Sequence, residues 1–410
     1  MIRPLLLLAL GVALGAPTGT EIVVGEDVPD IASALALAEP GDRVVLGPGE
    51  WPGPVIIEEA ITLSSAGGVL VGGEGTTLTL RAPGVVLDSL VLRGSGDDLQ
   101  GPDACIYVEP SAAGAVITNS TISDCLFGIW LHEVRGAQIL DNHVTGRPDV
   151  MVHSKGNGIH LFDSEQLIVR GNTVVGARDG IYVSATEDSL ISENVVSNQR
   201  FGIHYMFSYD NVIEHNVAND NTVGIALMES LRLEVRGNAA SRNQRQGILF
   251  RDVQYTQIVD NRVTENAEGF FFFSSLDNVI TGNTFAHNQI GARIWAGTER
   301  NEVYDNAFIS NREQVFYVST EADQIWGANY WSDYMGWDQD GDGHGDRPYR
   351  NDALMAQLLH KYPAAVLLLN SPCLELLRML QLRLPTLRVP TIIDNSPLLA
   401  PVARAAEETP

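Results

Sequence analysis

Residues 180–223 contain two successive copies of one pattern, GIYVSATEDSLISENVVSNQRF and GIHYMFSYDNVIEHNVANDNTV. Each copy has 22 residues, and both the leading glycine and one later asparagine recur beyond this stretch. The glycine column is Gly128, Gly158, Gly180, Gly202, Gly224, Gly247, Gly269 and Gly291. The asparagine column is Asn119, Asn142, Asn172, Asn194, Asn216, Asn238, Asn261, Asn283, Asn306 and Asn329. Both columns keep gaps of 22 or 23 residues and share one gap of 30, which indicates a repeat protein.

Each copy contains three short apolar runs separated by polar turns, in the first copy at residues 181–183, 190–192 and 195–196. These runs are too short for helices and suit short strands. The pattern predicts an all-β fold, a single right-handed parallel β-helix with three strands per coil, over residues 21–331. We expect asparagine to adopt left-handed turns and form ladders, and glycine to permit positive φ or close approach. Residues 30–42 predict a short helix and turn that cap the first coil.

Strand alternation predicts which side chains face outward. Positions one and three after each glycine are apolar and should face the core, so positions two and four should face out. This outward set is rich in aromatic, methionine and histidine residues, which favours an interaction surface unless loops or the C-terminal tail cover it. Met206 and Met228 occupy the same position of successive coils, and His204 precedes Met206 by two residues. Thioether and imidazole groups suit copper(I), so these three residues are the first-choice copper site.

The 30-residue gap predicts a protruding loop at residues 147–154. The loop carries Met151 and His153, and the outward face nearby carries His132 and His160. These four residues are the second-choice copper site. For every one of these residues, an ordinary surface or interface contact is the alternative.

A calcium-type loop is predicted within residues 332–352, where residues 338–346 read DQDGDGHGD. Oxygen groups at alternate positions followed by a glycine at the turn are what a calcium loop needs. The bidentate glutamate expected at the twelfth position is missing, and an acidic solvated turn is the alternative. The expected calcium ligands are Asp338, Asp340, Asp342, Asp346 and the backbone of His344.

The two ends of the chain differ from the repeats. Residues 1–16 read as a signal peptide, with an uncleaved anchor as the alternative. Residues 353–410 are expected to form a helix beginning at Ser371 and Pro372 and then an extended tail, which caps the last coil or binds another protein. Cys105 and Cys125 are candidates for a disulfide in an oxidising compartment.

Composition excludes some partners. The 410 residues include 51 acidic and 26 basic side chains, for a formal net charge of −25. Such a chain is a poor match for nucleic acid or a polyanionic polysaccharide, because backbone charges would have to be neutralised by basic groups.

Several segments resemble the NosD family, periplasmic maturation proteins of nitrous oxide reductase. The resemblance rests on GIHYMFS at 202–208, ALMES at 226–230, NYW at 329–331, the loop at 338–346 and SPCLELLRMLQ at 371–381. It implies a soluble periplasmic protein, membrane-associated through an ABC transporter partner, that handles copper in assembling the reductase copper sites. The tail would meet the transporter permease and ATPase complex, and the outer β-helix face would meet a copper chaperone and the reductase.

Two other functions compete with copper handling. One is a docking scaffold that never touches metal. The other is a polysaccharide lyase or epimerase, which needs a base beside a cationic group. The outward face offers Arg251 and Arg293, and we expect no tight acid–base cluster around them, so we expect no enzyme activity.

Overall fold

The computed structural model describes residues 19–295, 297–317, 324–352, 362, 371–372, 376, 379–380, 384 and 390–402. The predicted signal peptide at residues 1–16 lies outside the described residues. Most of the helix and tail predicted at residues 353–410 also lies outside them, and only scattered residues and residues 390–402 are described there.

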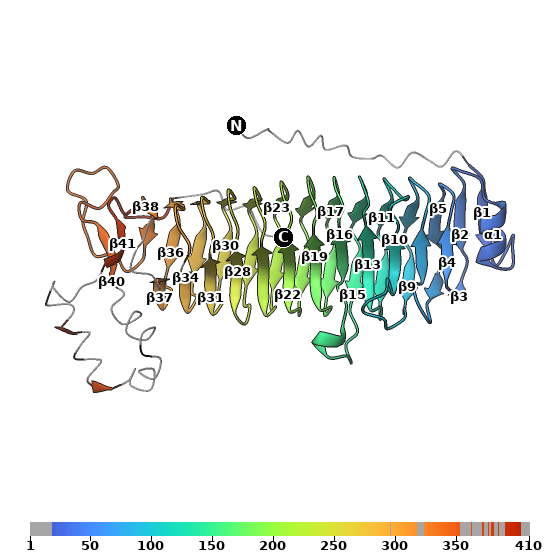
Figure 1. Cartoon of the computed structure of the whole chain (residues 1–410), viewed down its shortest axis with the longest axis horizontal. Helices are drawn as coiled ribbons and strands as arrows, with labels where there is room; N and C mark the ends of the chain where they lie inside the picture. The colour runs from blue at the N-terminus through green and yellow to red at the C-terminus, as the bar shows by residue number, and fades with distance from the viewer. Residues whose placement is uncertain are drawn as a thin grey trace.

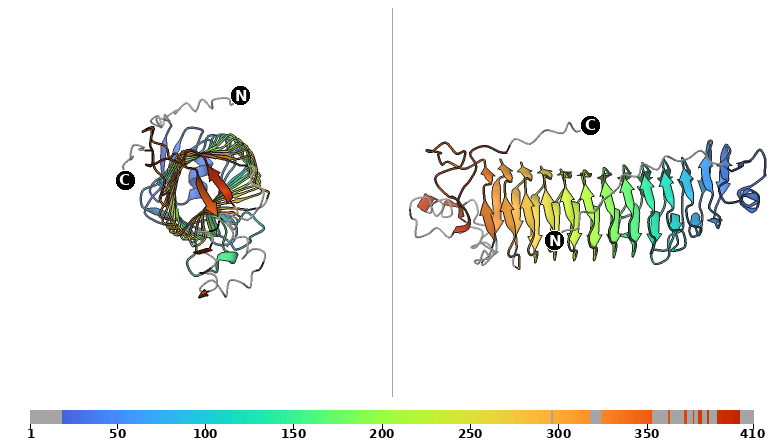
Figure 2. Two further views of the ribbon diagram at one scale, coloured as in Figure 1. Left: turned by 90° about the vertical axis from the view of Figure 1, so that its left-hand side faces the viewer. Right: turned by 90° about the horizontal axis from the view of Figure 1, so that it is seen from above.

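The described chain winds into a parallel β-helix, which confirms the predicted fold class (Figure 1). Three parallel sheets run along its axis, and the view down that axis shows them enclosing one core (Figure 2). Sheet A has 14 strands, from β1 (Glu21–Val24) to β38 (Ile325–Gly327), and sheet B has 13, from β3 (Gly49–Pro52) to β39 (Tyr330–Trp331). Sheet C has 12 strands: β4 (Val55–Ile57), β7 (Leu78–Leu80), β10 (Ala104–Val108), β13 (Phe127–His132), β16 (Ile159–Phe162), β19 (Asp179–Ser184), β22 (Phe201–Met206), β25 (Val223–Met228), β28 (Gln246–Arg251), β31 (Glu268–Phe273), β34 (Ile290–Ile294) and β37 (Glu313–Tyr317).

The predicted inward positions form the core. Ile181, Ile203, Ile225 and Ile248 pair in register through successive strands of sheet C, and all four are fully buried. Helix α1 (Ile31–Leu37) lies at the first coil and contacts β1, β4 and β2 (Arg43–Leu46), as predicted for the cap. Its N-cap is Asp30, whose side chain accepts a hydrogen bond from the Ser33 amide.

The recurring asparagines form a buried ladder from Asn142 to Asn329. In each step the Oδ1 atom of one asparagine accepts from the backbone N–H and the Nδ2 group of the asparagine one coil earlier; for Asn172 and Asn194 both distances are 3.0 Å. The Nδ2 group also donates to a carbonyl of the preceding coil, as Asn194 does to Val169 at 2.9 Å. The amide side chain therefore satisfies both itself and the backbone inside the solenoid.

The predicted left-handed role of asparagine is wrong for the ladder positions. The positive φ belongs to the residue before the ladder, such as Asp141, Glu193 or His215. Asn119 is one of these left-handed residues, with φ of 51°, and its neighbour Ser120 takes the ladder position by donating its N–H to Asn142. The first member of the ladder is therefore Ser120 and not the predicted Asn119, which directly precedes it.

The glycine column exists because coils approach closely. A Cβ atom on Gly180 would lie 2.4 Å from the carbonyl oxygen of Gly202, and one on Gly202 would lie 2.6 Å from that of Gly224. Neither glycine has positive φ, so close approach rather than left-handed geometry selects the residue.

The last coil is closed by a two-stranded antiparallel sheet of β40 (Tyr349–Asp352) and β41 (Pro390–Asp394). Asp394 is fully buried, and its Oδ2 atom accepts from the backbone and side chain of Asn329 and from Nε1 of Trp331 at 3.0 Å. The Tyr349 ring stacks on Trp331 with ring centroids 4.2 Å apart. Residues 390–394 thus cap the end of the solenoid.

Two further features lie near the N-terminal half. Cys105 and Cys125 form a disulfide between neighbouring coils, with Cα atoms 5.7 Å apart. The loop at residues 147–154 protrudes below β15 (His143–Thr145) in Figure 1 and contains the short 3-10 helix η1 (Val152–Ser154). Arg147 anchors the loop by donating to the carbonyls of Ser95 and Asp124.

Replacing the carboxylate at the end of the ladder should destabilise the protein. Asp394→Ala leaves the backbone N–H of Asn329 and the indole N–H of Trp331 buried without their acceptor, so we expect a loss on the order of 3 kcal/mol in unfolding free energy. Chemical denaturation measures the change, with Glu302→Ala, an exposed carboxylate on β35 (Glu302–Tyr304), as the control. Equal stability of Asp394→Ala and the control would contradict the capping role.

Candidate metal site

The first-choice copper residues lie together on the outer face of sheet C. Met206 on β22 pairs directly with Met228 on β25, so the two thioether side chains start from adjacent strands about 4.8 Å apart. His204 lies on the same face of β22, opposite Ala226. Ala226 carries no group that can bind a metal, so the possible metal ligands of this patch are Met206, Met228 and His204.

A carboxylate that was not among the predicted site residues holds His204. Nδ1 of His204 lies 2.9 Å from Oδ2 of Asp179, which is 2% exposed at the start of β19. Arg200 donates to both oxygens of the same carboxylate, at 2.8 and 2.6 Å. Burial raises the pKa of Asp179, but the hydrogen bonds from His204 and Arg200 outweigh it and leave the pKa below its usual value.

The other ring nitrogen of His204 is free to bind. Nε2 is buried and has no hydrogen-bond partner among the described residues. Because the Asp179 carboxylate can only accept, Nδ1 carries a hydrogen, and in the neutral form of the ring the lone pair lies on Nε2. Two thioethers and one imidazole nitrogen are a donor set that fits copper(I).

The patch is less open than we predicted. His204 and Met228 are only 6% and 9% exposed, and Met228 belongs to an apolar cluster with Val223 and Ala226 that also contacts Met206. Strand alternation is interrupted at each glycine, because the residue directly before it also reaches the outer face, while the residue directly after it faces the core. Phe201, directly before Gly202, packs its ring 4.6 Å from that of His204. The residues before the glycines therefore form an additional outward row, and their side chains cover much of the patch that holds His204, Met206 and Met228.

The second-choice copper residues are not assembled into one site. His132 ends β13 and contacts the Tyr107 hydroxyl at 2.9 Å through Nδ1, whereas Met151 and His153 lie on the loop that precedes the start of β16. The Gly156 amide, where the loop rejoins the sheet, donates to the Leu126 carbonyl directly before β13, so the length of β13, ~16 Å, separates the loop end from His132. His160 lies between them, stacked on Trp130 with ring centroids 4.5 Å apart, and both of its nitrogens lack a partner among the described residues. Burial lowers its pKa to about 3.

The expectation of no acid beside Arg293 is wrong. Glu268, at the start of β31, accepts hydrogen bonds from Arg293 and from Nε2 of Gln246, the latter at 2.7 Å. Glu268 directly precedes Gly269 of the glycine column. Like Phe201, it therefore belongs to the additional outward row formed by the residues before the glycines. The guanidinium lies between the rings of Trp295 and Phe316, at 5.1 and 4.9 Å from their centroids. Both carboxylate oxygens are thus engaged in a compact ion pair.

The acidic loop brings three of its predicted ligands together. Carboxylate oxygens of Asp338, Asp340 and Asp342 lie within 4.8 Å of one another, and no other group of three His, Cys, Asp or Glu side chains in the described residues is as close. Backbone N–H groups of Gly343 and Gly341 lower the pKa of Asp338. An N–H from Asp342 lowers the pKa of Asp340, but the Asp342 charge, burial and neighbouring acids raise it overall. Asp346 instead accepts from the Gln339 amide at 2.7 Å, and the side chain of His344 contacts the Ser396 carbonyl.

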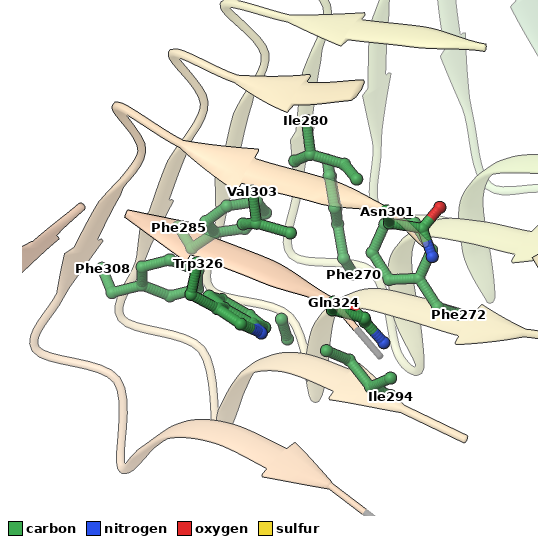
Figure 3. Close-up of a pocket in the computed structure, with 11 residues that line it drawn as sticks. Phe270, Phe272, Ile280, Phe285, Ile294, Asn301, Val303, Phe308, Gln324 and Trp326 are labelled. Carbon is green, nitrogen blue, oxygen red and sulfur yellow. The ribbon is translucent and has the colours of Figure 1, made fainter. Parts of the chain in front are cut away.

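A small apolar cavity lies in the interior, separate from the metal residues. It lies inside the coils near the C-terminal end and is lined by aromatic side chains such as Phe270, Phe285 and Trp326 (Figure 3). Its volume of about 10 Å³ admits at most about one water molecule. It is too small to serve as a ligand pocket.

Comparison with known proteins agrees with the resemblance. Residues 140–336 match the family described as "Periplasmic copper-binding protein (NosD)", and residues 27–235 match a family of unknown function, DUF1565. A "Probable ABC transporter binding protein NosD" of Pseudomonas aeruginosa is 39% identical over 89% of this chain and 92% of its own. The protein of the same name from Stutzerimonas stutzeri is 36% identical over 90% of each chain.

Solved structures agree in fold only. A family 28 exopolygalacturonase of Yersinia enterocolitica gives a TM-score of 0.54 at 11% identity over 72% of this chain and 73% of its own. An exopolygalacturonase of Thermotoga maritima gives 0.51 at 10% identity over 63% and 83%. Within the described residues, no helix has the length and apolar character needed to cross a membrane. The identity to the two NosD proteins over nearly their whole length shows that this chain belongs to the NosD family.

Proposed function

We propose that this protein is a non-enzymatic periplasmic accessory protein that receives and passes on copper(I) during assembly of the copper sites of nitrous oxide reductase. The observation that carries the proposal is the donor set of His204, Met206 and Met228 on the outer face of sheet C. The family description as periplasmic and copper-binding supports it. A site with three donor groups suits a metal that must leave again, because fewer ligands hold it than in a closed four-ligand site.

Burial of the site is compatible with transfer. Met206 and Met228 are unbranched and flexible, so their thioethers can move to admit an ion. The apolar cluster around them also excludes water, which otherwise competes for a soft metal ion. A partner that docks on this face would meet the sulfur atoms first.

The partners follow the same proposal. The relatives' name, ABC transporter binding protein, supports docking on a transporter permease and ATPase complex, which we place at the tail beyond the cap. A copper chaperone and the reductase would meet the outer face of sheet C. Membrane association would then come through the transporter.

The copper proposal predicts a sulfur-dependent affinity. The double variant Met206→Leu/Met228→Leu keeps volume and apolar character but removes both thioethers, so copper(I) affinity should fall by about tenfold or more, which is about 1.4 kcal/mol. Competition with a calibrated copper(I) chelator measures it. Met335→Leu, at a methionine 93% exposed outside the repeats, is the matched control and should bind as the wild type does.

Two outcomes would redirect the proposal. Unchanged affinity in the double variant would exclude this site and turn attention to His160, His132, Met151 and His153. Absence of copper binding in the wild type would favour the docking scaffold, in which the apolar cluster of Val223, Ala226 and Met228 only contacts a partner.

We also propose that the acidic loop binds one calcium ion that stabilises the end of the solenoid. The three clustered carboxylates of Asp338, Asp340 and Asp342 support this, because hard cations take several oxygen ligands. The loop lies against the cap, since the Gly345 amide donates to the Pro397 carbonyl at 2.8 Å.

Chelation should therefore lower the melting temperature of the wild type, because a ligand bound only to the folded state stabilises it. Asp340→Ala should remove most of that sensitivity, whereas Asp346→Ala, whose carboxylate is engaged with Gln339, should retain more of it. The measurement is thermal unfolding with and without chelator. An unchanged wild-type melting temperature would leave the loop as an acidic turn.

A further inference from the structure

We propose that Asp179 is a positioning residue for copper uptake, which holds His204 with its Nε2 lone pair available to the ion. The inference rests on the proposed copper function and names a residue through which that site works. Asp179 touches no ion itself; it acts on the imidazole that does.

The direct contact fixes one tautomer. Oδ2 of Asp179 lies 2.9 Å from Nδ1 of His204, and an ionised carboxylate offers only lone pairs. In the neutral ring the hydrogen must therefore sit on Nδ1, which leaves the lone pair on Nε2. Metal-binding histidines commonly have such a carboxylate partner, which fixes the ring and strengthens its donor nitrogen.

The carboxylate is itself held rigidly. Nε and a terminal nitrogen of Arg200 donate to both oxygens, at 2.8 and 2.6 Å, so the carboxylate cannot rotate away from His204 without losing a charged hydrogen bond. The Arg200 guanidinium lies 4.5 Å above the Phe201 ring, which also packs against the imidazole. The Tyr182 ring contacts the imidazole at a centroid distance of 5.0 Å.

A second histidine on the same face shows what the carboxylate adds. His160 occupies the corresponding strand position two coils earlier, in register with Tyr182, which in turn pairs with His204. The place that Asp179 takes for His204 is taken for His160 by Phe127, whose ring lies 5.6 Å from the imidazole. His160 therefore has no acceptor to choose its tautomer, and neither ring nitrogen has a partner among the described residues. Of these two histidines, His204 is the one whose tautomer is fixed for binding a metal ion.

The test compares two matched carboxamide variants. Asp179→Asn removes the charge and the obligatory acceptor next to His204 while keeping the side-chain shape. Glu268→Gln makes the same change at the corresponding position before a glycine, also beside an arginine and buried, but with no histidine in contact. Copper(I) affinity by chelator competition should fall about 10- to 100-fold in Asp179→Asn and stay unchanged in Glu268→Gln.

A second readout reports the tautomer directly. In metal-free protein labelled with ¹⁵N-histidine, and assigned with a His204→Gln variant, the His204 ring should show hydrogen on Nδ1 in the wild type. Asp179→Asn should shift this signal toward the Nε2–H form or a mixture. A role for Asp179 in folding alone would not move the tautomer.

Each result decides the inference. A wild type that binds copper together with an Asp179→Asn variant of equal affinity overturns the inference and leaves the proposed function standing. Equal weakening in both variants assigns the effect to general sheet stability, and a wild-type His204 with hydrogen on Nε2 overturns it even if Asp179→Asn fails to fold. A wild type that binds no copper overturns the proposed function, and the inference with it.

Discussion

The hydrogen bond from one asparagine to the next coil is the interaction on which the rest of the structure depends. Each step joins a side-chain oxygen to a backbone N–H and a side-chain amide of the neighbouring coil, so it fixes the coils in register as well as satisfying buried groups. A coil that gained or lost a residue between two ladder positions would have to absorb it in a turn. The eight additional residues after Asn142 do so in the protruding loop, and the ladder continues at Asn172 with unchanged geometry.

Register in turn brings together the residues of the candidate metal site. Met206 and Met228 are 22 residues apart in the chain but are direct strand partners, and Asp179 reaches His204 across one coil boundary. None of these contacts is local in sequence. Several buried side-chain nitrogens without partners, in Trp130, His160 and His204, lie on the same outer face of sheet C. Since such groups are costly when left unpaired, their concentration on one face favours a role there beyond packing.

Much of the fold followed from periodicity, because a repeat reports the same constraint many times. The three strands of the Gly180 coil, the inward isoleucines and the capping helix were all predictable from spacing and alternation. The error at Asn119 arose because its neighbour Ser120 takes the ladder position, where its backbone N–H donates to Oδ1 of Asn142. Asp394 could not be found this way, since it occurs once, in a segment without the repeat, 65 residues from its partner Asn329.

The site was only partly predictable for a related reason. Alternation correctly predicts that positions two and four after each glycine lie on the outer face, but it does not predict the direction of the residue before the glycine. That residue also points outward, so alternation alone does not identify Asp179, Phe201 and Glu268. A signal was available in the sequence, because an acidic residue at this position is followed 21 residues later by Arg200, almost one coil away. This signal can be used only once it is known that Asp179 and Arg200 lie next to each other on neighbouring coils.

Because the coils stack regularly, the solenoid also fixes the distance between any two points along its axis. From β25, which carries Met228, to β37 at the last coil of sheet C there are four strand-to-strand steps, or ~19 Å along the axis. That separation is set by the number of coils, and the ladder leaves little freedom to stretch or compress it. A molecule held at the capped end and another engaged at the methionines would therefore be kept at a fixed spacing, and evolution could change that spacing only in increments of one coil, ~4.8 Å at a time.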